Sequence, residues 1–198
     1  MLLAVVLFFI LVTTISAQDG GQTNNTEYRI VGYYSSWSIY GHQYFVTDIP
    51  AGKLTHINYA FFDISQDGEC ALGDELADVQ FRYPGDPENL PLYGNIRQLN
   101  LLRETNPDLK IMMSIGGLTW SSGFSDVALT DDSRQSFVLS CVEMMARYGF
   151  DGIDVDWEFP VSGGLGGGRP EDKGNFTLLL AEFRRWPLLF ADDCCPRA

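Results

Sequence analysis

Residues 150–160 contain the feature that most constrains how this chain folds, a strict alternation of apolar and acidic residues. The apolar ones are Ile153, Val155 and Trp157, and the acidic ones are Asp154, Asp156 and Glu158. A period of two predicts a β-strand with one apolar face and one acidic face. At roughly 3.3 Å of rise per residue, successive carboxyls stand about 6 to 7 Å apart, too close for all to ionise comfortably where water is reduced.

An edge strand with a solvated acidic face is the ordinary alternative. It is disfavoured because three consecutive like charges on one face repel one another and no Thr, Ser or Lys separates them. A divalent metal site is a second alternative, but the stretch lacks His partners and the loop spacing of calcium sites. A carboxylate array at the end of a strand suits glycosidic chemistry, in which neighbouring acids keep one acid protonated so that it can donate.

Two motifs resemble glycoside hydrolase family 18, the chitinases. The acids follow the spacing D-x-x-D-x-D-x-E from Asp151 to Glu158, and S-x-G-G occurs upstream at residues 114–117. The resemblance covers roughly residues 30–185. It implies a secreted enzyme that cleaves β-1,4 linkages between N-acetylglucosamine units, with chitin or its oligomers as partner and no cofactor or metal.

The resemblance also implies a role for each acid. Glu158 would be the general acid that protonates the oxygen of the scissile bond. Asp156 would hold the N-acetyl N–H and stabilise the positive charge of a cyclic intermediate, and Asp154 would share a proton with Asp156. The substrate's own N-acetyl oxygen would attack the anomeric carbon, so the configuration is retained.

Further positions match the family with supporting or substrate-binding roles. Tyr33 and Ser114 would support Asp154, whereas Asp151 is out of phase with the other acids and suits a structural role at the start of the strand. The aromatic residues expected near the sugar are Phe61, Trp157 and Trp120, with ordinary core packing as the alternative for each. Leu118 and Phe159 stand where the family usually has Trp and often has Tyr.

Hydrophobic periodicity predicts parallel βα units, and hence an α/β fold. The expected strands are 30–34, 54–62, 109–114 and the acidic strand, and the expected helices begin near Ile96 and span 131–148 and 175–185. Residues 63–94 read as a long irregular connection. In the family such units close into a (β/α)8 TIM barrel of about 250 residues, so this chain of 198 predicts an incomplete barrel of about four units.

The two ends of the chain depart from this pattern. Residues 1–17 read as a signal peptide cut before Gln18, with a short buried N-terminal strand as the alternative. Residues 18–198 would be a partial family 18 catalytic domain, in which 186–198 leave the family pattern. The four cysteines, Cys70, Cys141, Cys194 and Cys195, match no recognisable disulfide framework or zinc spacing.

The charge of the chain limits its partners. With 26 acidic residues against 13 Lys and Arg, the net charge of -13 disfavours nucleic acid and anionic membrane surfaces. We expect no membrane association after signal cleavage, and self-association through open barrel edges. The rival interpretations are a non-catalytic carbohydrate-binding protein, against which the intact Glu158 argues, and an inactive gene fragment, which the atypical tail favours.

Overall fold

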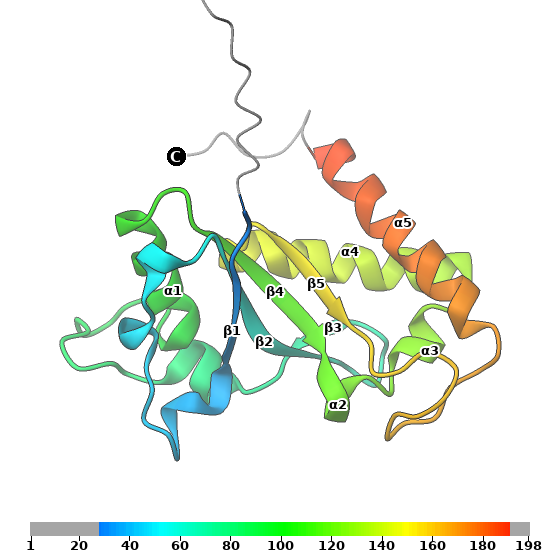
Figure 1. Ribbon diagram of the computed structural model, residues 1–198, viewed down its shortest axis with the longest axis horizontal. Coiled ribbons are helices and arrows are strands. Elements are labelled where there is room, and N and C mark those ends of the chain that lie inside the picture. The colour runs from blue at the N-terminus through cyan, green and yellow to red at the C-terminus, as the bar shows by residue number, and fades with distance from the viewer. Residues whose placement is uncertain (1–27, 191–198) are drawn as a thin grey trace, which may run out of the picture.

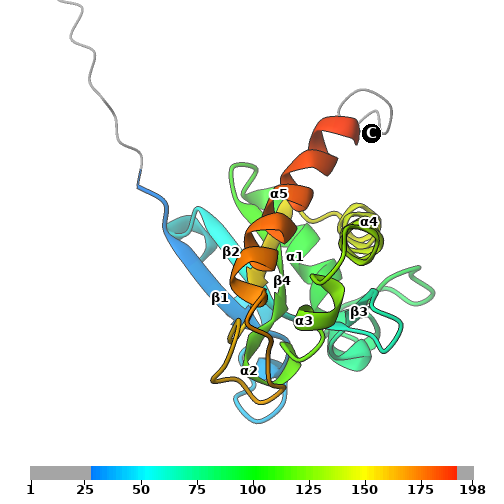
Figure 2. The ribbon, with the colours of Figure 1, turned by 90° about the vertical axis from the view of Figure 1, so that its right-hand side faces the viewer.

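The computed structural model describes residues 28–190, and for 187–190 only the backbone. The expected signal peptide, Cys194 and Cys195 lie outside the described residues. A mixed sheet forms the centre of the molecule, with helices packed on one side of it (Figures 1 and 2). No helix among the described residues is both long and apolar enough to cross a membrane.

Four parallel strands pair in chain order, β1-β2-β4-β5, and a short fifth strand, β3, pairs antiparallel with β2. Their bounds are β1 Val31–Ser35, β2 His56–Ile64, β3 Cys70–Leu72, β4 Lys110–Gly116 and β5 Gly152–Asp156. Sequential parallel strands joined by helices confirm the predicted α/β class and are consistent with a segment of a TIM barrel.

The connecting helices follow the apolar periodicity of the sequence. The longer ones are α1 Gly94–Thr105, α4 Asp131–Tyr148 and α5 Asp172–Phe190, and the short ones are α2 Gly117–Trp120 and α3 Phe124–Val127. The observed α4 has the expected bounds, because Thr130 caps its N-terminus by accepting from the Ser133 N–H and Gly149 ends it at φ 78. In contrast, α5 begins three residues earlier and ends five residues later than expected.

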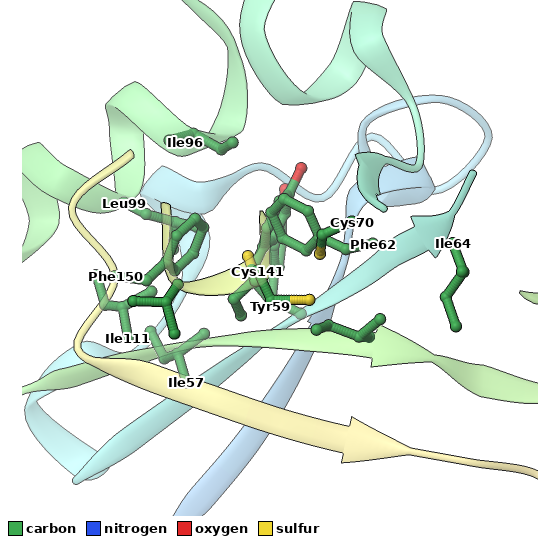
Figure 3. Packing of buried hydrophobic residues seen from close by; sticks show 14 of the residues in the cluster. Ile57, Tyr59, Phe62, Ile64, Cys70, Ile96, Leu99, Ile111, Cys141 and Phe150 are labelled. Carbon is green, nitrogen blue, oxygen red and sulfur yellow. The ribbon is translucent and has the colours of Figure 1, made fainter. Parts of the chain in front are cut away.

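The side chains on the helical side of the sheet form one apolar core. Ile57, Tyr59 and Phe62 come from β2, Ile111, Met113 and Ile115 from β4, and Phe137, Val138 and Cys141 from α4, all of them buried. Figure 3 labels Ile57, Tyr59, Phe62, Ile111 and Cys141 among them. Burying such side chains contributes about 1.5–3 kcal/mol each to folding. The core therefore fixes which face of each strand is turned away from the helices.

The prediction that residues 63–94 lack regular structure is wrong in part. This segment contains β3 and a π-helical turn, η4 Leu76–Gln80. The turn buries Asp78, whose carboxylate accepts from the Tyr59 hydroxyl and, at 3.0 Å, from the Asp74 N–H. Asn95 donates to the same Tyr59 hydroxyl at 3.2 Å. These long-range polar contacts, which local periodicity cannot reveal, order the segment.

Candidate active site

The parallel register divides each strand into a core face and an opposite polar face. Residues paired across parallel strands point to the same side. The pairs Tyr33↔Asn58, Ala60↔Ser114, Ser114↔Asp154 and Gly116↔Asp156 therefore lie together on the face that is turned away from the helices. The acids of β5 thus share one face with polar residues of the other parallel strands.

Asp154 is the point on which hydroxyls from two other strands converge. The Tyr33 hydroxyl donates to Asp154 Oδ2 at 2.8 Å, and the Ser114 hydroxyl donates to the same oxygen at 2.7 Å. Burial, together with the nearby Asp154 carboxylate, raises the pKa of Tyr33, while a hydrogen bond with Asn58 lowers it. Tyr33 therefore remains a protonated donor at neutral pH.

Asp156 lies between the other two acids in sequence and interacts electrostatically with both of them. Burial raises the pKa of its carboxyl, and the negative charges of Glu158 and Asp154 raise it further. Because β5 ends at Asp156, Glu158 lies just beyond the strand and is half-buried. The three acids therefore form one electrostatically coupled group at the carboxyl end of β5.

The two glycines of S-x-G-G allow β4 to approach this group closely. Gly116 has φ 107, and a Cβ there would lie 2.4 Å from the Asp156 carbonyl oxygen. Gly117 has φ 76, and a Cβ there would lie 2.7 Å from the Phe61 ring. Both backbone conformation and space exclude a side chain at these positions. The motif thus brings the end of β4 against the end of β5.

Ser121 is a residue of this site that the sequence analysis missed. Its hydroxyl lies 2.8 Å from the Gly117 carbonyl and 2.9 Å from the Asp156 carbonyl, and it accepts the Glu158 N–H at 2.8 Å. This buried hydroxyl ties the chain after β4 to the backbone on which Glu158 sits. Sequence pattern gave no signal for it, since a Ser in a short polar stretch resembles any loop residue.

Asp172 holds the loop of residues 159–171, which follows Glu158 and is rich in glycine. The sequence analysis did not identify Asp172 either. Its buried carboxylate accepts from the Ser125 hydroxyl at 2.8 Å and from the N–H groups of Arg169 and Val161 at 2.7 and 3.3 Å. Arg169 also pairs with Asp126 at 2.5 Å. The loop is therefore closed at its base by a polar network. The position of Asp172 at the start of α5 is the one sequence signal that could have identified this residue.

The three aromatic residues expected near the sugar occupy different places. Trp157 is buried on the core side, where its ring stacks on Phe124 at 5.3 Å, so the core-packing alternative accounts for it. The Phe61 ring lies 6.1 Å from that of Trp37, and the peptide bond before it is cis, as is the one after Glu158. Trp120 is half-buried and packs over Gly73.

Asp151 lies at the opposite end of β5 from the other acids. Its carboxylate accepts from the Ile111 N–H at 2.9 Å and pairs with Arg103 at 3.1 Å and with Lys110 at 3.9 Å. These contacts join the start of β5 to the start of β4 and to α1.

Among residues 28–190, no group of three or more His, Cys, Asp or Glu side chains is arranged to hold a metal ion.

Comparison with known proteins gives one consistent result. The family model described as glycosyl hydrolases family 18 matches residues 29–187. Chitinase A1 of Niallia circulans is 43% identical over 90% of this chain and 30% of its own length. These matches confirm the resemblance drawn from the two motifs.

Solved structures agree with the sequence matches. The catalytic domain of psychrophilic chitinase B from Arthrobacter TAD20 superposes with a TM-score of 0.78 at 35% identity, covering 83% of this chain and 49% of that one. Catalytic domain 2 of the Group II chitinase of Ostrinia furnacalis, in complex with penta-N-acetylchitooctaose, gives 0.68 at 26% identity, covering 80% and 40%. This chain thus spans less than a third of the Niallia relative and less than half of either structure.

Proposed function

The chain belongs to glycosyl hydrolases family 18, and from this membership we propose that its acidic strand end cleaves β-1,4 linkages between N-acetylglucosamine units of chitin. The Ostrinia relative was solved with a chito-oligomer, which supports this class of substrate. The activity requires a catalytic domain of the length that the relatives possess. The acids lie in the part of that domain that this chain represents.

We assign the acids complementary roles. Glu158 donates a proton to the glycosidic oxygen as the bond to the leaving sugar breaks. The carbonyl oxygen of the substrate's N-acetyl group attacks the anomeric carbon, while Asp156 accepts a hydrogen bond from the N-acetyl N–H and balances the developing positive charge. Water then opens the cyclic intermediate, with Glu158 taking back a proton, and the anomeric configuration is retained.

The observation that carries this proposal is the convergence of Tyr33 and Ser114 on one oxygen of Asp154. Two hydroxyl donors fix the carboxylate at the inner end of the array. With Asp154 held in this way, its charge acts on Asp156, and Asp156 in turn lies beside Glu158. With the three acids ordered in this way, Asp156 could hold a proton during one step of the reaction and release it in the following step.

We further propose that the protein is secreted, as the apolar run of residues 2–12 followed by small residues suggests. Sequencing the N-terminus of the protein recovered from a culture medium tests this. A mature chain that begins at Gln18 supports export and cleavage, whereas an intact Met1 on intracellular protein contradicts it.

Glu158→Gln tests the chemical assignment. The experiment uses a chimera in which residues 29–187 replace the matching segment of Chitinase A1 of Niallia circulans, so that the later strands are supplied. Loss of a general acid typically slows a reaction 10²- to 10⁴-fold, and we expect a loss of about that size with chito-oligomer binding retained.

Glu143→Gln is the matched control, because it makes the same change at an exposed position of α4. Release of a chromophore from an N-acetylglucosamine oligomer measures turnover, and calorimetry measures binding. Unchanged turnover in Glu158→Gln would refute the assignment. Binding without hydrolysis by the unsubstituted chimera would instead favour the carbohydrate-binding alternative.

A further inference from the structure

Two cysteines that are distant in sequence lie together in the core. Cys70 is the first residue of β3 and Cys141 lies on α4, and both are buried. The Cys70 N–H donates to the Ser140 hydroxyl at 2.9 Å, across a sequence separation of 70 residues. Figure 3 labels Cys70 and Cys141 in the same part of the buried core.

Both side chains come from elements whose positions are fixed independently. β3 is held by its pairing with β2, in which Ile64 faces Cys70. The helix α4 is held by its Thr130 cap and by burial of Phe137 and Val138. A disulfide requires the two Cα atoms within about 4.4–6.8 Å and Cβ atoms that face each other. The hydrogen bond from the Cys70 N–H to the hydroxyl of Ser140, the residue before Cys141, holds the start of β3 against α4 and brings the two cysteines near each other.

We propose that Cys70 and Cys141 are a disulfide site, bridged when the chain folds in the presence of a small-molecule disulfide such as oxidised glutathione. One cysteine thiolate attacks the small disulfide, which releases one thiolate and leaves a mixed disulfide. The second cysteine attacks that mixed disulfide and releases the other thiolate. Two protein thiols are oxidised, one small disulfide is reduced to two thiols, and the two protons leave with those thiols.

The core also determines when this bridge can form. Burial raises the pKa of the Cys141 thiol well above its ordinary value, and the neighbouring Cys70 thiol raises it further. Exchange requires a thiolate with access to the oxidant. A chain that has already folded in the reduced form therefore resists oxidation, whereas a chain that is still folding reacts.

The experiment uses the chain with Cys194→Ser and Cys195→Ser, which leaves Cys70 and Cys141 as its cysteines. One sample is refolded from denaturant with reduced and oxidised glutathione, and a second is folded under reducing conditions before oxidised glutathione is added. Each is quenched in acid, denatured, alkylated without reduction and weighed by mass spectrometry. We expect no alkylated cysteine in the first sample, two after it is reduced, and two in the second sample without reduction.

Tryptic mapping identifies the bridge directly. In the first sample the peptide of residues 54–82 should be linked to that of residues 135–147, and the unsubstituted chain should give the same linked pair. Cys70→Ala in the same background is the matched control and should leave Cys141 free to be alkylated. Two alkylated cysteines in a chain refolded to a native circular dichroism spectrum with oxidant present would overturn the proposal, as would glutathione adducts on single cysteines.

Discussion

The hydroxyl of Tyr33 on β1 donates a 2.8 Å hydrogen bond to Asp154 on β5, although two strands separate them in the sheet. In a flat sheet these strands would lie about 14 Å apart, with their side chains perpendicular to the sheet. The bond therefore requires a strongly curved sheet, with the acids on its concave side. Such curvature is what a segment of a closed barrel has.

The two donors to Asp154 should act as a unit. In the chimera defined above, we expect Tyr33→Phe and Ser114→Ala each to lower kcat by about 10-fold, the effect of one lost hydrogen bond to a charged group, while KM changes little. Both hydroxyls donate to the same oxygen. The increase in activation free energy in the double variant should therefore differ from the sum of the increases in the two single variants. Strict additivity in a double-mutant cycle would mean that Asp154 does not couple them.

Replacing the middle acid should slow the reaction even though Glu158 remains. We expect Asp156→Asn in the chimera to lose about 10²-fold or more in kcat and to change the acidic limb of the pH–rate profile, because burial and the neighbouring acids raise the pKa of Asp156. Asp151→Asn is the control, the same change at the other end of β5. It should lower the melting temperature and leave the profile unchanged. A wild-type profile in Asp156→Asn, in both limbs and in height, would show that the acids are not coupled.

Buried Asp78 should make stability fall as pH rises. Burial raises its pKa from 3.8 to about 6, so the folded chain holds this proton more tightly than the unfolded chain. Its contribution to the free energy of unfolding is fully present below pH 3.8 and is lost as pH rises through about 6, a change on the order of 3 kcal/mol.

Urea unfolding of the chimera at a series of pH values measures this change. Asp78→Asn should flatten the curve over that window, because an amide does not titrate but can still accept from Tyr59. Asp67→Asn, at an exposed position, should leave the slope as it is in the wild type. Equal slopes in wild type and Asp78→Asn would assign the pH dependence to other groups.

The chain by itself should self-associate and show little or no hydrolysis. Among the described residues, β1 and β5 are the edges of the parallel sheet, and an apolar groove between β5 and α5 is lined by Ile153, Val155, Phe176, Leu180 and Phe183. Open apolar edges favour pairing with another copy. Light scattering of the chain should therefore give a mass above 22.1 kDa.

Two leucines on α5 provide a matched pair of variants. Leu180 lines the groove and Leu178 does not, and both are exposed. Leu180→Lys should reduce the apparent mass more than Leu178→Lys does. A monodisperse monomer with turnover near the typical enzyme value of about 10 s⁻¹ would contradict both parts of this prediction.

The sequence predicted the parts of this fold that depend on local pattern. The alternation of residues 153–158 identified β5, and the apolar periodicity of residues 131–148 identified α4. The burial of Asp78 against Tyr59 was not predictable, because it depends on contacts between elements that are distant in sequence.

The same distinction applies to the site. Asp154, Asp156 and Glu158 were identified as candidates from their spacing, and in the structure the charges of Asp154 and Glu158 act on Asp156. Ser121 was not found, because its contribution is a hydrogen bond to the backbone of Glu158 that any Ser in a loop could make. The side of the sheet occupied by Trp157 follows from the alternation itself, once the acids are placed on the other face.

Because Asp154 and Asp156 alternate with Ile153, Val155 and Trp157, each position of β5 is constrained by only one of the two faces. Substitutions at the even positions can change the chemistry of the site without disturbing the core, and those at the odd positions can change packing without altering the charges. A gain or loss of one codon within 152–156 is different, since it would turn carboxylates toward the helices and apolar side chains toward the acids' side. A point substitution in this short strand therefore alters one face of the sheet, whereas a frame-preserving insertion or deletion alters both faces at once.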